Sequence, residues 1–518
     1  MVAESGLKGR DFAAYKKLLV AKSCYIYVDL ATNRFFMIEN EVLTGREEER
    51  QILEKALISP KAEMISVIGR RRVGKTFLVK SVYGTQLDFE VTGIQFATRE
   101  EQLRNFMLRL SDFSNGTFPL TEPKDWIEAF HFLAKFLELK QKEKTEKLIV
   151  FLDELPWLST HRSGFLKGFS FFWNSWAVNQ NIVVVICGSA ASWMIKKVVH
   201  HKGGLHNRIT RRITLKPFTL GETERFLKVK NFNFEQYQIL HLYMALGGVP
   251  HYLDEIEGGK SAAQNINQIC FAENGLLYDE FSKLYSSLFE NAENHIKIIR
   301  ALAKKKKGLT RSEVVEQSKV AEGGGLTTVL GELVHSGFIS MYHPFGNKKK
   351  NCLYRLTDEY SLFYLQFIEN NRNIGDGIWQ ELSQTQFYTS WAGYAFESIC
   401  LKHIPQIKKA LGISGVYTTA SAFFRKGTDE TAGIQIDLLL DRNDHIINVC
   451  EMKFYNAELT IDKSMAMNFR NKLANFKTLS KTRKQVFLTL VTTFGVQQNK
   501  HSLGLVDVAL TMEDLFKA

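Results

Sequence analysis

The chain has 518 residues, of which 45% are hydrophobic and 12% aromatic, so it is too long for one core and suits about three packed domains. Its formal net charge of +12 favours a polyanionic partner, and its six scattered cysteines argue against a disulfide framework or a zinc site and fit a reducing cytoplasm. No stretch reaches the length of a membrane span, and the first residues lack the apolar segment of a signal peptide, so we expect a cytoplasmic protein with no membrane contact.

The first predicted elements are two short strands. Residues 24–30 and 34–39 alternate around Ala31-Thr32-Asn33 in the way of a hairpin. We therefore assign residues 1–40 to an N-terminal extension, in which no residue carries recognisable chemistry.

Residues 67–76, with the sequence VIGRRRVGKT, contain the phosphate-loop pattern G-x-x-x-x-G-K-[ST]. The apolar run before the loop predicts a buried strand and the run after it predicts a helix, which is the context that the motif requires. The glycines would let backbone N–H groups converge on phosphate oxygens, Lys75 would reach the β- and γ-phosphates, and the Thr76 hydroxyl would ligate Mg²⁺. The predicted nucleotide-binding residues of this loop are Gly69, Arg70, Arg71, Arg72, Val73, Gly74, Lys75, Thr76 and Phe77. The alternative is a chance match in a glycine turn.

An acidic pair follows the next clear strand. Residues 148–152 are continuously apolar, which is typical of a strand buried on both faces of a parallel sheet, and the pair stands at its carboxyl end, where such sheets bind ligands. Asp153 would hold Mg²⁺ through its hydration shell, and Glu154 would polarise the attacking water. The alternative is an ordinary acidic strand end.

Two further residues are candidates for contact with the γ-phosphate. A third buried strand, residues 182–187, leads to Ser189, which either senses the γ-phosphate or caps a helix over 190–199. Arg208, in a basic loop, is the candidate for stabilising charge on the transferring phosphoryl group. The alternative for Arg208 is a solvated basic loop or an edge that faces DNA. The aromatic residues at helical spacing between 161 and 178 are expected to cover the sheet.

These motifs occur in an order that resembles the archaeal and bacterial predicted ATPases of the AAA+ superfamily, close to the origin-recognition-like and STAND branches. The resemblance also includes Gly45-Arg46, Lys216-Pro217-Phe218 and Leu246-Gly247-Gly248-Val249-Pro250, and it covers residues 41–368. It implies binding and hydrolysis of ATP with Mg²⁺, a nucleotide-dependent homo-oligomer, and a position beside the adenine for Arg46 and Pro250. The alternatives for these two residues are a helix start and a tight turn between helices. The three consecutive arginines of the loop exceed the number usual in the family.

Residues 293–368 predict a winged helix, with three helices followed by a hairpin around Gly346-Asn347-Lys348-Lys349-Lys350. Its third helix, over 326–336, would enter the major groove of DNA while the basic wing touches phosphate. Because that helix presents no arginine or glutamine to the bases, we expect backbone contact with little sequence specificity. The alternative is a protein partner or an extension of the lid.

The last segment, residues 369–518, contains a predicted hairpin of strands 434–440 and 446–454. Asp437 and Glu451 would share a Mg²⁺ ion, with Lys453 beside the attacking water, because Glu451 and Lys453 point to one face of their strand.

This hairpin resembles the PD-(D/E)xK nucleases, with Ile436 in place of the family's proline. The resemblance implies a DNA-cutting site of Asp437, Glu451 and Lys453, and makes Glu397 an auxiliary metal ligand. Two alternatives are a nuclease-like fold that holds DNA without cutting it, and a surface hairpin whose charges face solvent.

The predicted architecture is an α/β chain with four parts after the extension. They are a phosphate-loop ATPase core with a parallel sheet (41–215), a helical lid (216–292), the winged helix (293–368) and a restriction-endonuclease-like α/β domain (369–518). The predicted function is an ATPase whose nucleotide state controls DNA binding and a DNA-cutting or DNA-holding domain. The rival prediction is a STAND-like signalling or defence switch whose last domain binds a protein partner.

Overall fold

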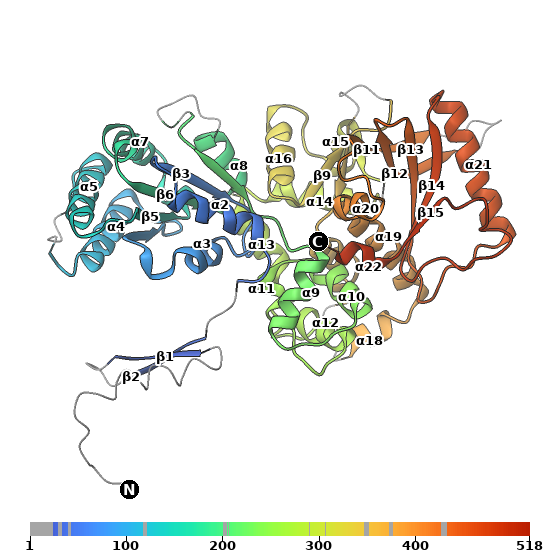
Figure 1. Cartoon of the computed structure of the whole chain (residues 1–518), viewed down its shortest axis with the longest axis horizontal. Helices are drawn as coiled ribbons and strands as arrows, with labels where there is room; N and C mark the ends of the chain where they lie inside the picture. The colour runs from blue at the N-terminus through green and yellow to red at the C-terminus, as the bar shows by residue number, and fades with distance from the viewer. Residues whose placement is uncertain are drawn as a thin grey trace, which may run out of the picture. The chain divides into compact units, whose positions relative to one another are not determined.

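The structure is a computed structural model that describes residues 24–29, 34–39, 43–117, 122–199, 205, 207–289, 291–305, 307–346, 352–371, 377–425 and 433–517 (Figure 1). The chain divides into an N-terminal unit that ends at Thr44 and a second unit that begins at Gly45. In the first unit, β1 (Cys24–Asp29) and β2 (Arg34–Glu39) pair antiparallel, which confirms the predicted hairpin. Within the described residues, no helix has both the length and the apolar character needed to cross a membrane.

A five-stranded parallel sheet, in the order β4-β5-β6-β3-β7, is the centre of the first part of the second unit. Its strands are β3 (Glu63–Ile68), β4 (Phe89–Thr92), β5 (Leu148–Asp153), β6 (Ile182–Gly188) and β7 (Arg211–Thr214). Every residue of β3, β5 and β6 is buried, so the apolar runs are indeed strands covered on both faces. Residues 89–97 have the apolar character of a strand, but β4 ends at Thr92 and a loop leads into the next helix.

Helices α4, α5 and α7 pack together beside this sheet (Figure 1). The helices of this part are α2 (Glu47–Leu57), α3 (Lys75–Tyr83), α4 (Arg99–Phe113), α5 (Trp126–Glu143), α6 (Leu155–Leu158), α7 (Phe165–Ser175) and α8 (Ala191–Met194). Phe165, Phe169 and Phe172 of α7 are buried in one cluster with Val150 and Val184 of the sheet. The aromatic stripe therefore covers the sheet, as its helical spacing predicts.

The helical segment that follows is built on a tight approach of two backbones. Its helices are α9 (Leu220–Val229), α10 (Gln236–Leu246), α11 (Pro250–Leu253), α12 (Ala262–Cys270) and α13 (Glu280–Leu288). A Cβ on Gly248 would lie 1.9 Å from the carbonyl oxygen of Phe218, and the Phe218 N–H donates to the Gly248 carbonyl at 2.5 Å. Gly248 is therefore required because no side chain fits between the turn after β7 and the turn after α10.

Residues 293–356 contain three helices and a small antiparallel sheet of order β8-β10-β9. The elements are α14 (Glu293–Ala303), β8 (Leu309–Thr310), α15 (Arg311–Ser318), α16 (Gly324–His335), β9 (Ile339–Tyr342) and β10 (Leu353–Leu356). Thr310 and Glu313 form a capping box at the start of α15. The tip of the predicted wing, residues 347–351, lies outside the described residues.

A second five-stranded sheet, of order β11-β12-β13-β14-β15, forms the last part of the chain. Its strands are β11 (Thr418–Arg425), β12 (Ile434–Arg442), β13 (Ile446–Lys453), β14 (Gln485–Thr492) and β15 (Val508–Leu510). The accompanying helices are α17 (Glu359–Phe363), α18 (Ile378–Leu382), α19 (Gln386–Lys402), α20 (Ile404–Ala410), α21 (Lys463–Ser480) and α22 (Met512–Phe516). Strands β12 and β13 pair antiparallel with Leu438 opposite Cys450, which confirms the predicted hairpin, whereas β13 and β14 are parallel.

Candidate functional site

The phosphate loop connects the carboxyl end of β3 to the first turn of α3. Gly74 adopts a left-handed φ of +85° immediately before α3, as a tight turn into a helix requires. The Lys75 ammonium is 6% exposed and donates to the carbonyl oxygen of Arg70 at 3.0 Å, so the lysine folds back across its own loop. The predicted strand, glycine turn and helix are all present, and the loop begins at the edge of the sheet where parallel strands place ligands.

We expect Gly69→Ala to weaken ATP binding more than Gly74→Ala. A Cβ at position 69 would lie 2.4 Å from the Leu215 carbonyl oxygen, a backbone atom, and such overpacking costs about 1–3 kcal/mol. A Cβ at position 74 would meet no heavy atom within 4 Å, so an alanine there has only the cost of the left-handed backbone, about 1–2 kcal/mol, and no clash with the backbone of the turn after β7. Titration with ATP, together with a melting curve to verify folding, measures the difference. Equal affinities of the two variants would contradict this account of the loop.

The predicted magnesium ligands lie against each other. Thr76 Oγ1, in the first turn of α3, donates a hydrogen bond of 2.7 Å to Asp153 Oδ2 at the end of β5. Asp153 is 3% exposed, and the N–H of Glu154 donates to its other carboxylate oxygen at 2.9 Å. A hydroxyl and a fixed carboxylate beside a phosphate loop are hard oxygen donors, so these residues fit Mg²⁺ bound together with phosphate oxygens.

Ser189 holds the carboxylate of Glu154. Its N–H and its hydroxyl donate to Glu154 Oε2 at 3.0 and 2.8 Å. Glu154 itself has a left-handed φ of 45°, a conformation that is uncommon for a residue with a side chain. Of the two alternatives for Ser189, the helix cap is wrong, because Ala190 occupies the cap position of α8 and the serine hydroxyl is used on Glu154.

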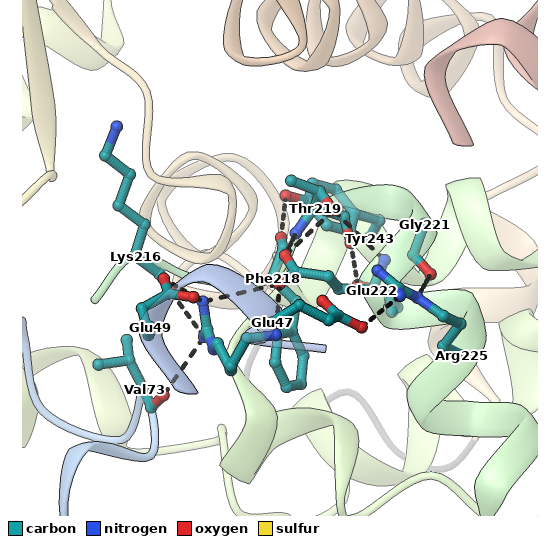
Figure 2. Close-up of polar contacts among 12 residues, drawn as sticks. Glu47, Glu49, Val73, Lys216, Phe218, Thr219, Gly221, Glu222, Arg225 and Tyr243 are labelled. Atoms are coloured by element: carbon teal, nitrogen blue, oxygen red, sulfur yellow. Dashed lines mark hydrogen bonds and ion pairs between the residues drawn. The ribbon is translucent and has the colours of Figure 1, made fainter. Parts of the chain in front are cut away.

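Arg46 braces the phosphate loop from the segment before α2. Figure 2 labels the residues that it contacts, among them Lys216, Val73 and Phe218. Its Nη2 donates to the carbonyl oxygens of Lys216 and Val73 at 2.7 and 3.4 Å, and its guanidinium lies 4.5 Å from the centroid of the Phe218 ring. Burial lowers the pKa of Arg46, which the Glu222 carboxylate opposes. The side chain therefore ties the loop to the turn after β7, whereas Pro250 begins α11.

The remaining loop residues differ in exposure. Arg70 is buried and pairs with Asp358, Arg72 pairs with Glu280 at 2.9 Å, and Arg71 is half-buried. Val73 is buried in the core, and Phe77 is 36% exposed on α3. The partners of Arg70 and Arg72 lie far along the chain, and no sequence signal pointed to them.

Arg208 lies near the amino-terminal ends of the parallel strands, whereas the phosphate loop follows the carboxyl end of β3. It is exposed and stands just before Thr210, whose N–H donates to the Met64 carbonyl at 2.9 Å. Met64 is near the start of β3, whereas the phosphate loop begins at the end of β3. Arg208 is therefore not brought together with Lys75 and Glu154 within one chain.

A separate cavity of about 390 Å³ lies in the last part of the chain. It is lined by Glu451 and Lys453 at the end of β13 and by Asn468 and Lys472 of α21. Glu451 is 5% exposed and accepts a hydrogen bond of 2.6 Å from Lys472 Nζ. Burial raises the pKa of Glu451, and the cations Lys472 and Lys453 oppose that rise. The contact of Lys472 was missed by the sequence analysis, because only the tertiary fold brings α21 against β13.

The three carboxylates predicted as metal ligands of this segment do not form one ligand set. Glu397 pairs with Arg355 at 2.8 Å, Glu451 pairs with Lys472, and Asp437 lines a different cavity. Burial raises the pKa of Glu397, and the charges of Asp437 and Glu451 raise it further, so the three groups lie in one region. In the described part of the chain, however, no three Asp, Glu, His or Cys side chains converge closely enough to hold a metal ion. The sharing of Mg²⁺ by Asp437 and Glu451 alone stays a prediction, because Leu438 lies opposite Cys450 and the charge of Asp437 raises the pKa of Glu451, so these two carboxylates lie near each other.

The comparisons with known proteins agree with the geometry of the first part. Residues 43–256 match a family described as an ATPase domain predominantly from Archaea. An uncharacterised protein of Methanocaldococcus jannaschii, MJECL04, is 24% identical over 420 residues, which span 80% of this chain and 88% of the relative. The part of the chain that carries the phosphate loop is thus a P-loop ATPase domain.

Solved structures with low sequence identity also align with the chain. A Walker-type ATPase of Pyrococcus abyssi is 20% identical with a TM-score of 0.47, over 63% of this chain and 97% of the other. The ORC2 protein of Aeropyrum pernix, in ADPNP-ADP complexes, is 15% identical with a TM-score of 0.36, over 65% and 94%. A STAND protein of Pyrococcus horikoshii with a tetratricopeptide repeat sensor is 15% identical with a TM-score of 0.30, over 72% and 52%.

Proposed function

We propose that the protein is a cytoplasmic, Mg²⁺-dependent ATPase whose nucleotide state controls a C-terminal domain that holds DNA. The observation that carries the proposal is the hydrogen bond of 2.7 Å between Thr76 and Asp153, which joins the phosphate loop to the acidic end of β5. Lys75 and Glu154 adjoin this pair in the chain, so cation, metal ligands and base come from the segments at the carboxyl ends of β3 and β5, which flank β6 in the sheet. The cysteines whose side chains are described are all free, which supports a reducing compartment.

Each group of the site has a chemical role in the proposed hydrolysis. Lys75 would turn from the Arg70 carbonyl to the β- and γ-phosphate oxygens, and Thr76 and Asp153 would hold Mg²⁺. The ion would neutralise the charge that develops on the phosphate oxygens. Glu154 would accept a hydrogen bond from the attacking water, and Ser189 holds its carboxylate in place for that task.

Self-association is part of the proposal. Arg208 is exposed near the amino-terminal ends of the parallel strands, away from its own phosphate loop. An arginine in that position stabilises phosphoryl transfer only if it reaches the nucleotide of a neighbouring copy. We therefore expect ATP to promote assembly of the chain.

DNA is the proposed partner of the last two parts of the chain. The net charge of +12 suits a polyanion, and Lys453, Lys472 and Asn468 line the C-terminal cavity together with Glu451 and Asp462. Because Glu451 is paired with Lys472 and Glu397 with Arg355, we propose that this part of the chain holds a phosphate backbone rather than cutting it.

A specific observation favours the second candidate function, a signalling switch that binds a protein partner. The surfaces that a winged helix uses on DNA make internal contacts here. The Phe345 N–H, beyond β9, donates to Ala422 of β11 at 2.6 Å, and Glu332 of α16 pairs with Lys196 at 3.5 Å. In this arrangement the segment is a connector between the ATPase domain and the C-terminal sheet.

One experiment separates these functions. The purified protein is incubated with ATP, Mg²⁺ and plasmid, and ATP hydrolysis, nicking and DNA binding at several salt concentrations are measured. We expect hydrolysis, salt-sensitive DNA binding and no nicking. Weak binding with a shallow salt dependence would favour the switch, nicking would restore the nuclease, and absence of nucleotide binding would remove the proposal altogether.

A further inference from the structure

A buried ion pair connects the phosphate loop to a residue outside the ATPase domain. Arg70 is 4% exposed and pairs with Asp358, which is 1% exposed and follows it by 288 residues. The ring of Phe338 lies 5.4 Å from the Arg70 guanidinium and helps to exclude water from the pair. Asp358 lies beyond residues 43–256, so it is outside the part of the chain that matches the ATPase family.

Asp358 is fixed by a second set of contacts. Its Oδ2 accepts hydrogen bonds from the N–H and the hydroxyl of Ser361 at 2.9 and 2.6 Å, as the cap of α17. Burial acts against ionisation of Asp358, but Arg70 and Ser361 outweigh it and lower the pKa of the carboxyl. The carboxylate is therefore charged and has no freedom to follow a moving loop.

Neighbours of Asp358 contact the helix that carries Glu397. We call residues 355–359 the bridge segment. Its first residue, Arg355, pairs with Glu397 of α19 at 2.8 Å, and its last residue, Glu359, accepts two hydrogen bonds of 2.6 and 2.7 Å from Lys402 of α19. The bridge segment thus touches the phosphate loop through Asp358 and the C-terminal part through its two ends.

A second loop arginine is held in a similar way. Arg72 pairs with Glu280 of α13 at 2.9 Å, and the Tyr252 hydroxyl donates to the same carboxylate at 3.2 Å. Glu280 is 2% exposed, so this carboxylate is also fixed. Phosphate is bound by the backbone N–H groups of the loop. The ion pairs of Arg70 and Arg72 therefore help to fix the backbone conformation in which these N–H groups point at the phosphate.

We propose that Asp358 is a positioning residue of the nucleotide site, which holds the phosphate loop through Arg70 in the shape that binds ATP. The proposal rests on the ATPase function proposed above. Preorganisation of a loop raises affinity because ordering it no longer opposes binding. Coupling between two sites is reciprocal, so bound ATP in turn stabilises the contacts of the bridge segment with α19. The C-terminal part then responds to whether ATP is bound.

The test is the variant Asp358→Asn, which keeps the size of the side chain and removes its charge. We expect the Kd for ATP and the KM for hydrolysis to rise roughly 5- to 150-fold, the range of typical coupling between sites, while kcat at saturating ATP stays near that of the unsubstituted protein. The control is Glu369→Gln, which breaks the exposed ion pair with Arg300 and is expected to leave both quantities unchanged. An unchanged Kd in Asp358→Asn, or an equal loss in the control, would overturn the proposal.

Two further measurements keep the test decisive. Arg70→Met and the double variant Arg70→Met/Asp358→Asn are expected to bind ATP equally weakly, because each removes the same ion pair. A further loss of affinity in the double variant, equal to the sum of the single losses, would overturn the proposal. In the unsubstituted protein, ATP is expected to slow hydrogen exchange of the bridge segment, and no change there would overturn it even if the variants do not fold. A protein that binds no ATP at all would instead remove the proposed function.

Discussion

Lys75→Ala is expected to abolish measurable ATP binding, with a loss of roughly 100-fold or more in affinity, since each hydrogen bond to a charged group contributes about 1.5–3 kcal/mol. The ammonium is buried against the Arg70 carbonyl, so it is already desolvated and within its own loop before a phosphate arrives. Arg70 and Arg72 do not replace it, because they pair with Asp358 and Glu280. Titration with a fluorescent ATP analogue measures the loss.

Lys80→Ala is the matched control for this variant. Lys80 lies on the same helix, is half exposed and pairs with Glu90 at 2.7 Å. Exposed pairs contribute little to stability, so this change is expected to leave ATP affinity unchanged. Normal binding by Lys75→Ala, or equal losses in both variants, would mean that the phosphates sit elsewhere.

Glu154→Gln is expected to lower the rate of ATP hydrolysis at least about 100-fold while ATP still binds, the magnitude typical of losing a general base. Glutamine keeps an oxygen that accepts the two hydrogen bonds from Ser189, so the geometry of the strand end is retained. What it loses is the negative charge that draws a proton from the attacking water. Phosphate release under saturating ATP measures the rate, and an equilibrium titration measures binding.

Glu138→Gln serves as the control for that experiment. Glu138 lies on α5, where it pairs with Lys135 at 2.9 Å and receives a hydrogen bond from Trp176. Its loss is expected to leave hydrolysis unaffected. If Glu154→Gln hydrolysed ATP at the normal rate, the water would have to be activated by another group, and the role of β5 would be limited to the metal.

The local parts of the site were readable from the sequence because their physics is local. A phosphate loop needs a strand, two glycines, a lysine and a hydroxyl within ten residues, and an apolar run before Asp153 predicts a buried strand with a carboxylate at its end. The hairpin of β12 and β13 and the capping box of α15 are likewise set by neighbours in the chain. The strand, glycine turn and helix of the loop, the strand before Glu154 and the hairpin are all present, whereas the binding roles of their residues stay predictions.

The shape of the loop after β4 and the role of Ser189 were not readable in the same way. Residues 93–97 are apolar enough for a strand, but the backbone leaves the sheet at Gly93, where a Cβ would lie 2.8 Å from the Glu154 carbonyl. Ser189 precedes a helix and so has the pattern of a cap. Its hydroxyl goes to Glu154 because β5 and β6 are adjacent in the sheet, which a pattern along one chain does not encode.

The candidate triphosphate-binding residues could be named from the sequence, since they lie in one short loop and at one strand end. The partner of each charge could not, because it depends on how the chain folds. Arg70 pairs with Asp358, so a loop rich in arginine is anchored, and Lys472 pairs with Glu451, a carboxylate that the hairpin alone would leave open to a metal ion. This is because the Coulomb energy of two charges depends on their distance in space and not on their separation along the chain.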